Sequence, residues 1–168
     1  MKKKFLSVII DFFFFNLCYC FVYIRKIDSV QPAVMPKAAF SWDAYYDLAG
    51  IYGWLDSVVA GNPSIAQTII GGSTHEGRQI KGVKLSYKAG NPGVFIESCI
   101  HAREWIGCAT STWILNELIT SSDPAVRNIA ENYDWYFFPV TNPDGYEFTH
   151  TNVKILKLVP IPNNFFLF

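Results

Sequence analysis

The chain contains 168 residues, of which 14 are acidic and 14 basic, so its formal net charge is zero. Because a nucleic-acid-binding surface needs excess positive charge, this balance argues against a nucleic-acid partner. A hydrophobic fraction of 51% and an aromatic fraction of 17% exclude a disordered acidic tail and, at this length, predict one globular domain.

The first 24 residues have the pattern of a secretory leader. Three lysines at positions 2–4 precede an apolar run over residues 5–24, and this order is typical of a signal peptide. The run is also long enough for an uncleaved anchor, although Asp11 within it is costly in a bilayer. We expect a signal peptide or signal anchor, and hence a secreted or membrane-anchored protein. A non-native extension from a gene-model error is the other interpretation.

Residues 25–40 contain two prolines and are predicted to be a linker. Ser41 is then the expected N-cap of a helix, with Asp43 in its first turn. The helix is predicted to end at residues 61–63, Gly-Asn-Pro. Its apolar positions recur in steps of three and four, at Tyr45, Leu48, Ile51, Tyr52, Leu55, Val58 and Val59.

Three strands are expected next. Residues 65–70 form the first, which should turn at Gly71-Gly72, and residues 79–87 form the second. After a turn of Gly and Pro, the apolar run over residues 94–100 has the composition of a buried strand.

Two helices and a strand complete the pattern. Residues 104–119 have helical apolar spacing, and Asp123-Pro124 is a capping pair that starts another helix. An aromatic strand follows over residues 134–140, and residues 142–145 are interpreted as a turn. This order predicts an α/β fold in which helices flank a mixed β-sheet.

Side chains suited to a metal follow the buried strand at a strand-to-helix junction. His101 and Glu104 are three residues apart, and an imidazole nitrogen and a carboxylate oxygen are both suitable zinc ligands. Ligands also bind at the carboxyl ends of strands in α/β sheets. The spacing alone is equally consistent with a hydrogen-bonded junction histidine and a first-turn acid.

The surrounding residues resemble a known family. Residues 95–106, Phe-Ile-Glu-Ser-Cys-Ile-His-Ala-Arg-Glu-Trp-Ile, closely resemble the zinc-binding motif of metallocarboxypeptidases of the carboxypeptidase A/B type. Residues 140–150 resemble the family's next signature stretch, and residues 42–55 and 71–79 resemble earlier parts of its fold. We therefore expect residues 41–152 to be a partial zinc carboxypeptidase domain.

The resemblance implies a function and a set of roles. The family comprises secreted zinc exopeptidases that remove the C-terminal residue from peptides, so Zn²⁺ is the implied cofactor and a peptide C-terminus the implied substrate. His101 and Glu104 match the first two zinc ligands, and Arg103 matches a position that contacts the peptide. The family's third ligand and its general-base glutamate lie further downstream, so no catalytic residue of this chain is assigned.

The rest of the chain departs from the family pattern. His75 and His150, the other histidines, match no ligand position. Residues 153–168 form an apolar tail with the residue types of translated AT-rich non-coding DNA. We expect a truncated form with an incomplete active site, and an aggregation-prone one, because a sheet cut partway exposes an unpaired edge.

Two alternative functions stay open, namely a non-catalytic peptide- or metal-binding fragment and a membrane-anchored structural protein. The oligomeric state is left open as well. Several other side chains are given structural interpretations. They are Cys99 and Cys108 as buried, unreactive thiols, Trp105 and Trp113 as core residues, and Arg127 and Glu147 as solvated side chains.

Overall fold

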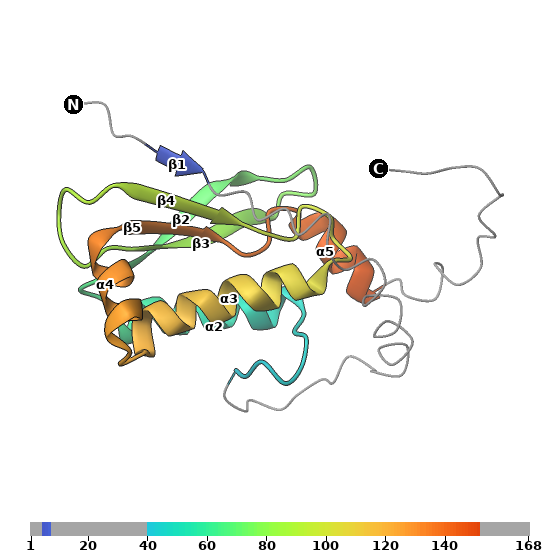
Figure 1. The fold of residues 1–168 in the computed structure, drawn as a ribbon. Helices are drawn as coiled ribbons and strands as arrows, with labels where there is room; N and C mark the ends of the chain where they lie inside the picture. Colours follow the sequence, from blue (N-terminus) through green and yellow to red (C-terminus); the bar gives the residue numbers. More distant parts are fainter. Residues whose placement is uncertain (1–4, 8–39, 152–168) are drawn as a thin grey trace, which may run out of the picture.

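The computed structural model describes residues 5–7 and 40–151, and its five strands form a single mixed sheet (Figure 1). The predicted leader, linker and apolar tail otherwise lie outside the described residues. The sheet order is β1-β4-β5-β3-β2, and β1, β4 and β5 are parallel, whereas β3 and β2 are antiparallel to their neighbours. The strands are β1 (Phe5–Ser7), β2 (Ala66–Ser73), β3 (Gln79–Leu85), β4 (Gly93–Glu97) and β5 (Asp134–Phe138).

Among residues 40–151, four helices accompany the sheet: α2 (Leu48–Gly61), α3 (Trp105–Thr120), α4 (Pro124–Asn132) and α5 (Pro143–Thr151). The helices α2 and α3 lie along the same face of the sheet (Figure 1). Fully buried side chains from both layers meet there, among them Leu55 of α2, Val83 and Leu85 of β3, Leu115 of α3 and Phe137 of β5. The α/β class with a mixed sheet and flanking helices, expected from the sequence, is confirmed. Within residues 40–151, no helix has both the length and the apolarity needed to cross a bilayer.

The start of the first helix differs from the prediction. Asp47, and not Ser41, is the N-cap of α2, and its Oδ1 accepts a hydrogen bond from the Gly50 amide at 2.8 Å. The Ser41 amide instead donates to the Tyr46 hydroxyl at 3.0 Å, while Phe40 stacks on the Tyr46 ring. Aromatic packing therefore holds residues 40–46 out of the helix that their spacing indicated.

The end of the first predicted strand is also different. β2 continues through Gly71 and Gly72 to Ser73, with a break in its register to β3 between Ile70 and Ser73. Gly72 has a φ of +143°, which glycine adopts at little cost and which suits an irregularity of this kind. The reversal of the chain follows at Thr74, whose carbonyl accepts from the Gly77 amide at 3.1 Å.

Residues 142–145 are the start of a helix, which corrects their interpretation as a turn. Pro143 occupies the first turn of α5, with Asp144 beside it facing the positive end of the helix dipole. The Asn142 side chain accepts from the Gly145 amide at 3.0 Å, as an N-cap does. Glu147 consequently lies on a helix, partly exposed, and not on a strand-like stretch.

Two further side-chain interpretations were wrong. Arg127 is not directed only at solvent, because its guanidinium donates to the Leu118 carbonyl at the end of α3 at 2.9 Å and lies over the Tyr87 ring. Trp113 is 48% exposed and not in the core, whereas Trp105 packs against the core.

Trp113 and Ile106 lie two turns apart on α3 and form an exposed apolar stripe, with Ile106 61% exposed. We predict that replacing both by Gln reduces self-association, because exposed apolar patches drive nonspecific contact. Light scattering should show a smaller particle, with an unchanged far-ultraviolet circular dichroism spectrum. Leu115→Gln is the control on the same helix: Leu115 is fully buried, so this variant should unfold. If the double Gln variant unfolded as the Leu115→Gln variant does, the exposed position of Ile106 and Trp113 would be contradicted.

Candidate metal centre

The predicted site residues share one short turn between β4 and α3. The Glu104 amide donates to the His101 carbonyl at 2.9 Å, and the Gly107 amide donates to the Glu104 carbonyl at 2.9 Å, so the chain turns sharply into the helix. The side chains of His101, Arg103 and Glu104 are all exposed there. The structure thus brings the three predicted residues to one accessible corner, which we call the β4–α3 corner (residues 98–107).

Glu104 occupies the N-cap position of α3, but its side chain makes no capping hydrogen bond. Ser, Thr, Asp and Asn are preferred at this position because their short side chains reach the orphan amides of the first turn. Glu104 offers no such stabilisation, and its carboxylate stands at the accessible surface. A residue type poorly suited to capping at a helix start is consistent with selection for another role.

Two buried cysteine thiols lie at the corner: Cys99 is one of its residues and Cys108 follows it directly. Cys99 has a φ of +54°, uncommon for a residue with a side chain, and its thiol donates to the Glu104 carbonyl at 3.4 Å. Contact with the Cys99 thiol, together with burial, raises the pKa of the Cys108 thiol well above its ordinary value. The prediction that both cysteines are buried is confirmed, since Cys99 is 4% and Cys108 3% exposed.

Backbone pairing beyond the strand ends joins the corner to the segment after β5. The Ser98 amide donates to the Phe138 carbonyl, and the Thr141 amide donates back to the Ser98 carbonyl, each at 3.1 Å. The Thr141 hydroxyl also donates to the Ser98 carbonyl at 2.9 Å. These bonds place the start of α5 beside the β4–α3 corner.

The first turn of α5 rests on the corner itself. The Asn142 side-chain Nδ2 donates to the Ile100 carbonyl, one residue before His101, at 3.2 Å. A Cβ on Gly145 would lie 2.8 Å from the Ala102 Cβ, closer than two such carbons can approach. Glycine at position 145 therefore allows α5 to press against the corner, which fixes the backbone on both sides of His101.

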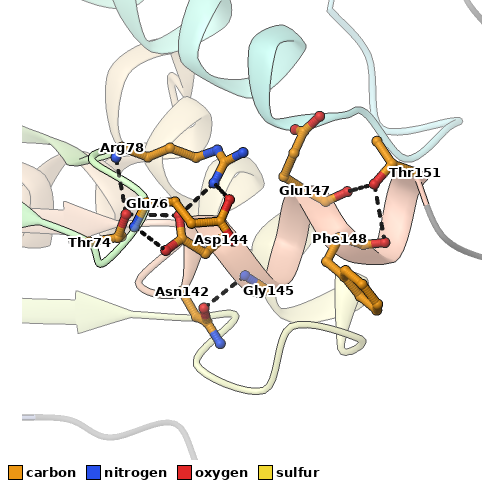
Figure 2. A network of polar contacts seen from close by, with 9 residues as sticks. All are labelled: Thr74, Glu76, Arg78, Asn142, Asp144, Gly145, Glu147, Phe148 and Thr151. Atoms are coloured by element: carbon orange, nitrogen blue, oxygen red, sulfur yellow. Dashed lines mark hydrogen bonds and ion pairs between the residues drawn. The ribbon is translucent and has the colours of Figure 1, made fainter.

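Asp144 clamps the same helix to the loop between β2 and β3 (Figure 2). Its carboxylate accepts from the Thr74 hydroxyl at 2.8 Å, the Glu76 amide at 3.1 Å and the Arg78 guanidinium at 2.7 Å. Arg78 also pairs with the Glu76 carboxylate. Desolvation alone raises the pKa of Asp144, but the bonds from Arg78, Thr74 and Glu76 outweigh it, so this pKa lies below its ordinary value. Asp144 is therefore held as a carboxylate.

His150, at the end of α5, lies flat against Trp105, with ring centroids 4.2 Å apart. Both of its ring nitrogens are buried without a hydrogen-bond partner among the described residues. Burial lowers the pKa of His150, an effect that the charge of Asp47 opposes, and thus favours the neutral ring. Its stacking on Trp105 gives His150 a packing role next to the corner.

The chemistry of the corner suits zinc only in part. Imidazole and carboxylate are appropriate donors, yet a catalytic zinc site uses three protein ligands and keeps a fourth position open. Within residues 5–7 and 40–151, no group of three His, Cys, Asp or Glu side chains is placed to hold a metal. Two donor side chains alone do not make such a site, so no catalytic step can be derived through a metal from the described residues.

Comparison with known proteins identifies the family. The family model described as zinc carboxypeptidase (peptidase M14) matches residues 51–158, which include the corner. The chain belongs to the zinc carboxypeptidase family. This is a family of hydrolytic metalloproteases that act as exopeptidases, and the resemblance seen in the sequence is confirmed.

Two curated relatives show how much of such a protein the chain contains. It is 55% identical over 119 residues to a zinc carboxypeptidase of Simulium vittatum, covering 71% of this chain and 39% of that protein. It is 51% identical over 113 residues to zinc carboxypeptidase A 1 of Anopheles gambiae, covering 67% of this chain and 26% of that protein. The chain thus spans between about a quarter and two fifths of these curated relatives.

Solved structures agree on the fold. Thrombin-activatable fibrinolysis inhibitor is similar with a TM-score of 0.67 and 27% identity, over 77% of this chain and 33% of that one. Carboxypeptidase A of Helicoverpa armigera has a TM-score of 0.66 and 25% identity, over 77% of this chain and 34% of that one. The chain therefore has the arrangement of part of a carboxypeptidase domain.

The residues that support the corner were not predicted from the sequence. Nothing in local spacing linked Thr74 and Arg78 to Asp144, because their contact depends on the tertiary fold. The start of α5 did carry a local signal. Asn142-Pro143 has the same order of capping residue and proline that correctly identified the start of α4 at Asp123-Pro124, where Asp123 accepts from the Ala125 amide at 2.7 Å.

The contact between Gly145 and the corner can be tested with a pair of glycine variants. We predict that Gly145→Ala lowers the stability by about 1–3 kcal/mol, because the added methyl group forces α5 away from Ala102. Gly107→Ala is the matched control: its Cβ would meet Ser98 at 3.6 Å, an ordinary contact, and alanine favours a helix by up to about 1 kcal/mol. Urea unfolding would measure both. A Gly145→Ala variant as stable as the Gly107→Ala variant would contradict the close contact.

The Asp144 clamp predicts a dependence of stability on pH. A carboxyl group whose pKa is lowered in the folded state stabilises the fold above its unfolded pKa, near 3.8, and loses that effect as pH falls through the folded pKa. Asp144→Asn should lower the Tm at pH 7, and its difference from the unmodified protein should shrink below about pH 4. Asp43→Asn changes an exposed aspartate outside the clamp and should leave the Tm unchanged at both pH values. A Tm difference for Asp144→Asn that is constant with pH would argue against the clamp.

Proposed function

We propose that this chain provides the first two zinc ligands, His101 and Glu104, and a substrate-binding residue, Arg103, of a metallocarboxypeptidase that removes C-terminal residues from peptides. The observation that carries the proposal is the β4–α3 corner. In one turn it exposes the His101 imidazole and the Glu104 carboxylate, which makes no capping hydrogen bond to the helix. This turn lies within the segment that matches the zinc carboxypeptidase family. The relatives are named zinc carboxypeptidases, which supports zinc as the metal and removal of C-terminal residues as the reaction class.

Each of the three side chains has a defined part in this function. His101 and Glu104 would hold the zinc ion, which supplies Lewis-acid activation of the scissile carbonyl when it is bound. Arg103, exposed beside them, offers charge-assisted hydrogen bonds to a peptide carboxylate or carbonyl. The hydrogen bond from Asn142 to the Ile100 carbonyl and the packing of Gly145 on Ala102 hold the turn in place.

A second candidate function is a non-catalytic module that binds zinc or a peptide at the same corner. It is favoured by the absence of a third metal-binding side chain near the other two within the described part of the chain. Release of a C-terminal amino acid from a blocked peptide distinguishes the candidates. Hydrolysis that Glu104→Gln abolishes supports catalysis, whereas zinc binding without hydrolysis supports the binding module.

We also propose that the protein is secreted, on the basis of the lysines and apolar run of residues 2–24.

Zinc titration tests the metal site directly. We predict that His101→Ala weakens zinc binding by about tenfold or more, because it removes one of two protein donors. Competition with a chromophoric chelator would measure the affinity. His75→Ala removes another exposed histidine and should leave the affinity unchanged. Zinc affinity that is the same for the His101→Ala variant and the unmodified chain would exclude the corner as the site.

A further inference from the structure

The thiols of Cys99 and Cys108 at the β4–α3 corner can take part in chemistry that does not depend on zinc. Cys99 and Cys108 belong to the same buried core cluster, on opposite sides of the turn that holds His101 and Glu104. Both are present as free thiols in the structure. Their burial leaves them little exposed to solvent, so each has mainly the other and its core neighbours as possible reaction partners.

Both cysteines lie close to the backbone at Glu104. The Cys99 thiol donates to this carbonyl at 3.4 Å, so its sulfur lies at the start of the helix. Cys108 follows Glu104 by four residues in α3, the separation at which helical backbone groups face each other. The backbones are also close, because a Cβ on Gly107 would lie 3.8 Å from the Cys99 nitrogen. With the backbones this close, the thiols of Cys99 and Cys108 are in contact across the corner.

We propose that Cys99 and Cys108 form an intramolecular disulfide when the chain folds in the presence of a low-molecular-weight disulfide such as oxidised glutathione. One cysteine thiolate attacks the small disulfide, which releases one glutathione thiol and leaves a mixed disulfide. The second cysteine then attacks the protein sulfur of that mixed disulfide and releases the second glutathione. The two cysteines together lose two protons and two electrons, and the oxidant is reduced to two thiols.

Burial determines when this exchange takes place. Folded packing around Cys108 excludes the small disulfide, since Ser111, Leu115 and Tyr146 in the same region are themselves buried. The exchange therefore occurs while α3 is not yet packed, during folding or local opening. Once formed, the bond closes a short loop that contains His101 and Glu104 and restricts the unfolded chain.

The experiment uses the full chain with Cys18→Ser and Cys20→Ser, so that only the two proposed partners remain. The protein is refolded with reduced and oxidised glutathione and then digested with trypsin without reduction. Trypsin cleaves after Lys88, Arg103 and Arg127, which puts Cys99 and Cys108 on separate peptides, 89–103 and 104–127. We expect these peptides to be recovered joined, about 2 Da lighter than their sum, and to separate on reduction.

The stability of the oxidised form gives a second readout. The disulfide should raise the Tm by about 5 °C or more over the reduced form of the same protein. Cys108→Ser in the same background is the control, and its Tm should not respond to glutathione disulfide. Two thiols that both stay open to alkylation after refolding, or that both end as separate glutathione adducts, would overturn the proposal. So would a joined peptide pair whose formation lowers the Tm.

Discussion

Parallel pairing of β4 with β5 is the interaction on which the candidate site depends. The hydrogen bonds continue past the strand ends through Ser98, which bonds both the Phe138 carbonyl and the Thr141 amide. Since parallel neighbours end at the same edge of a sheet, the turn after β4 and the turn after β5 must lie side by side. The Ser98 hydroxyl strengthens this join by bonding the Pro139 carbonyl and the Ser111 hydroxyl.

The elements of the fold could be predicted where local signals agreed with tertiary packing. Alternating or continuous apolar residues identified β3, β4 and β5, and a cap followed by proline identified α4. The signal failed at residues 40–46, where Phe40 stacks between Tyr46 and Trp54 and removes the segment from the helix. Helical spacing describes which faces are apolar, but it does not state which partner will cover them.

The candidate site, like the fold, could be predicted from the sequence only in part. His101, Arg103 and Glu104 were found because they lie within one turn and match a family motif. The supporting residues were not found, because Arg78 and Asp144, or Asn142 and Ile100, meet only after the sheet has assembled. Local sequence patterns thus indicated the candidate site side chains, whereas the residues that hold the turn in place depend on tertiary contacts. The latter determine whether two donors three residues apart point to a common position.

The irregular end of β2 affects how the sheet meets other molecules. β2 lies at one border of the sheet, and a regular border strand offers an open row of amides and carbonyls that another chain can continue. The break in register between Ile70 and Ser73, with Gly72 in a left-handed conformation, interrupts that row toward the C-terminal end of the strand. Ordered stacking of one copy onto another through this border is thereby hindered, which protects the chain against fibril growth from that side.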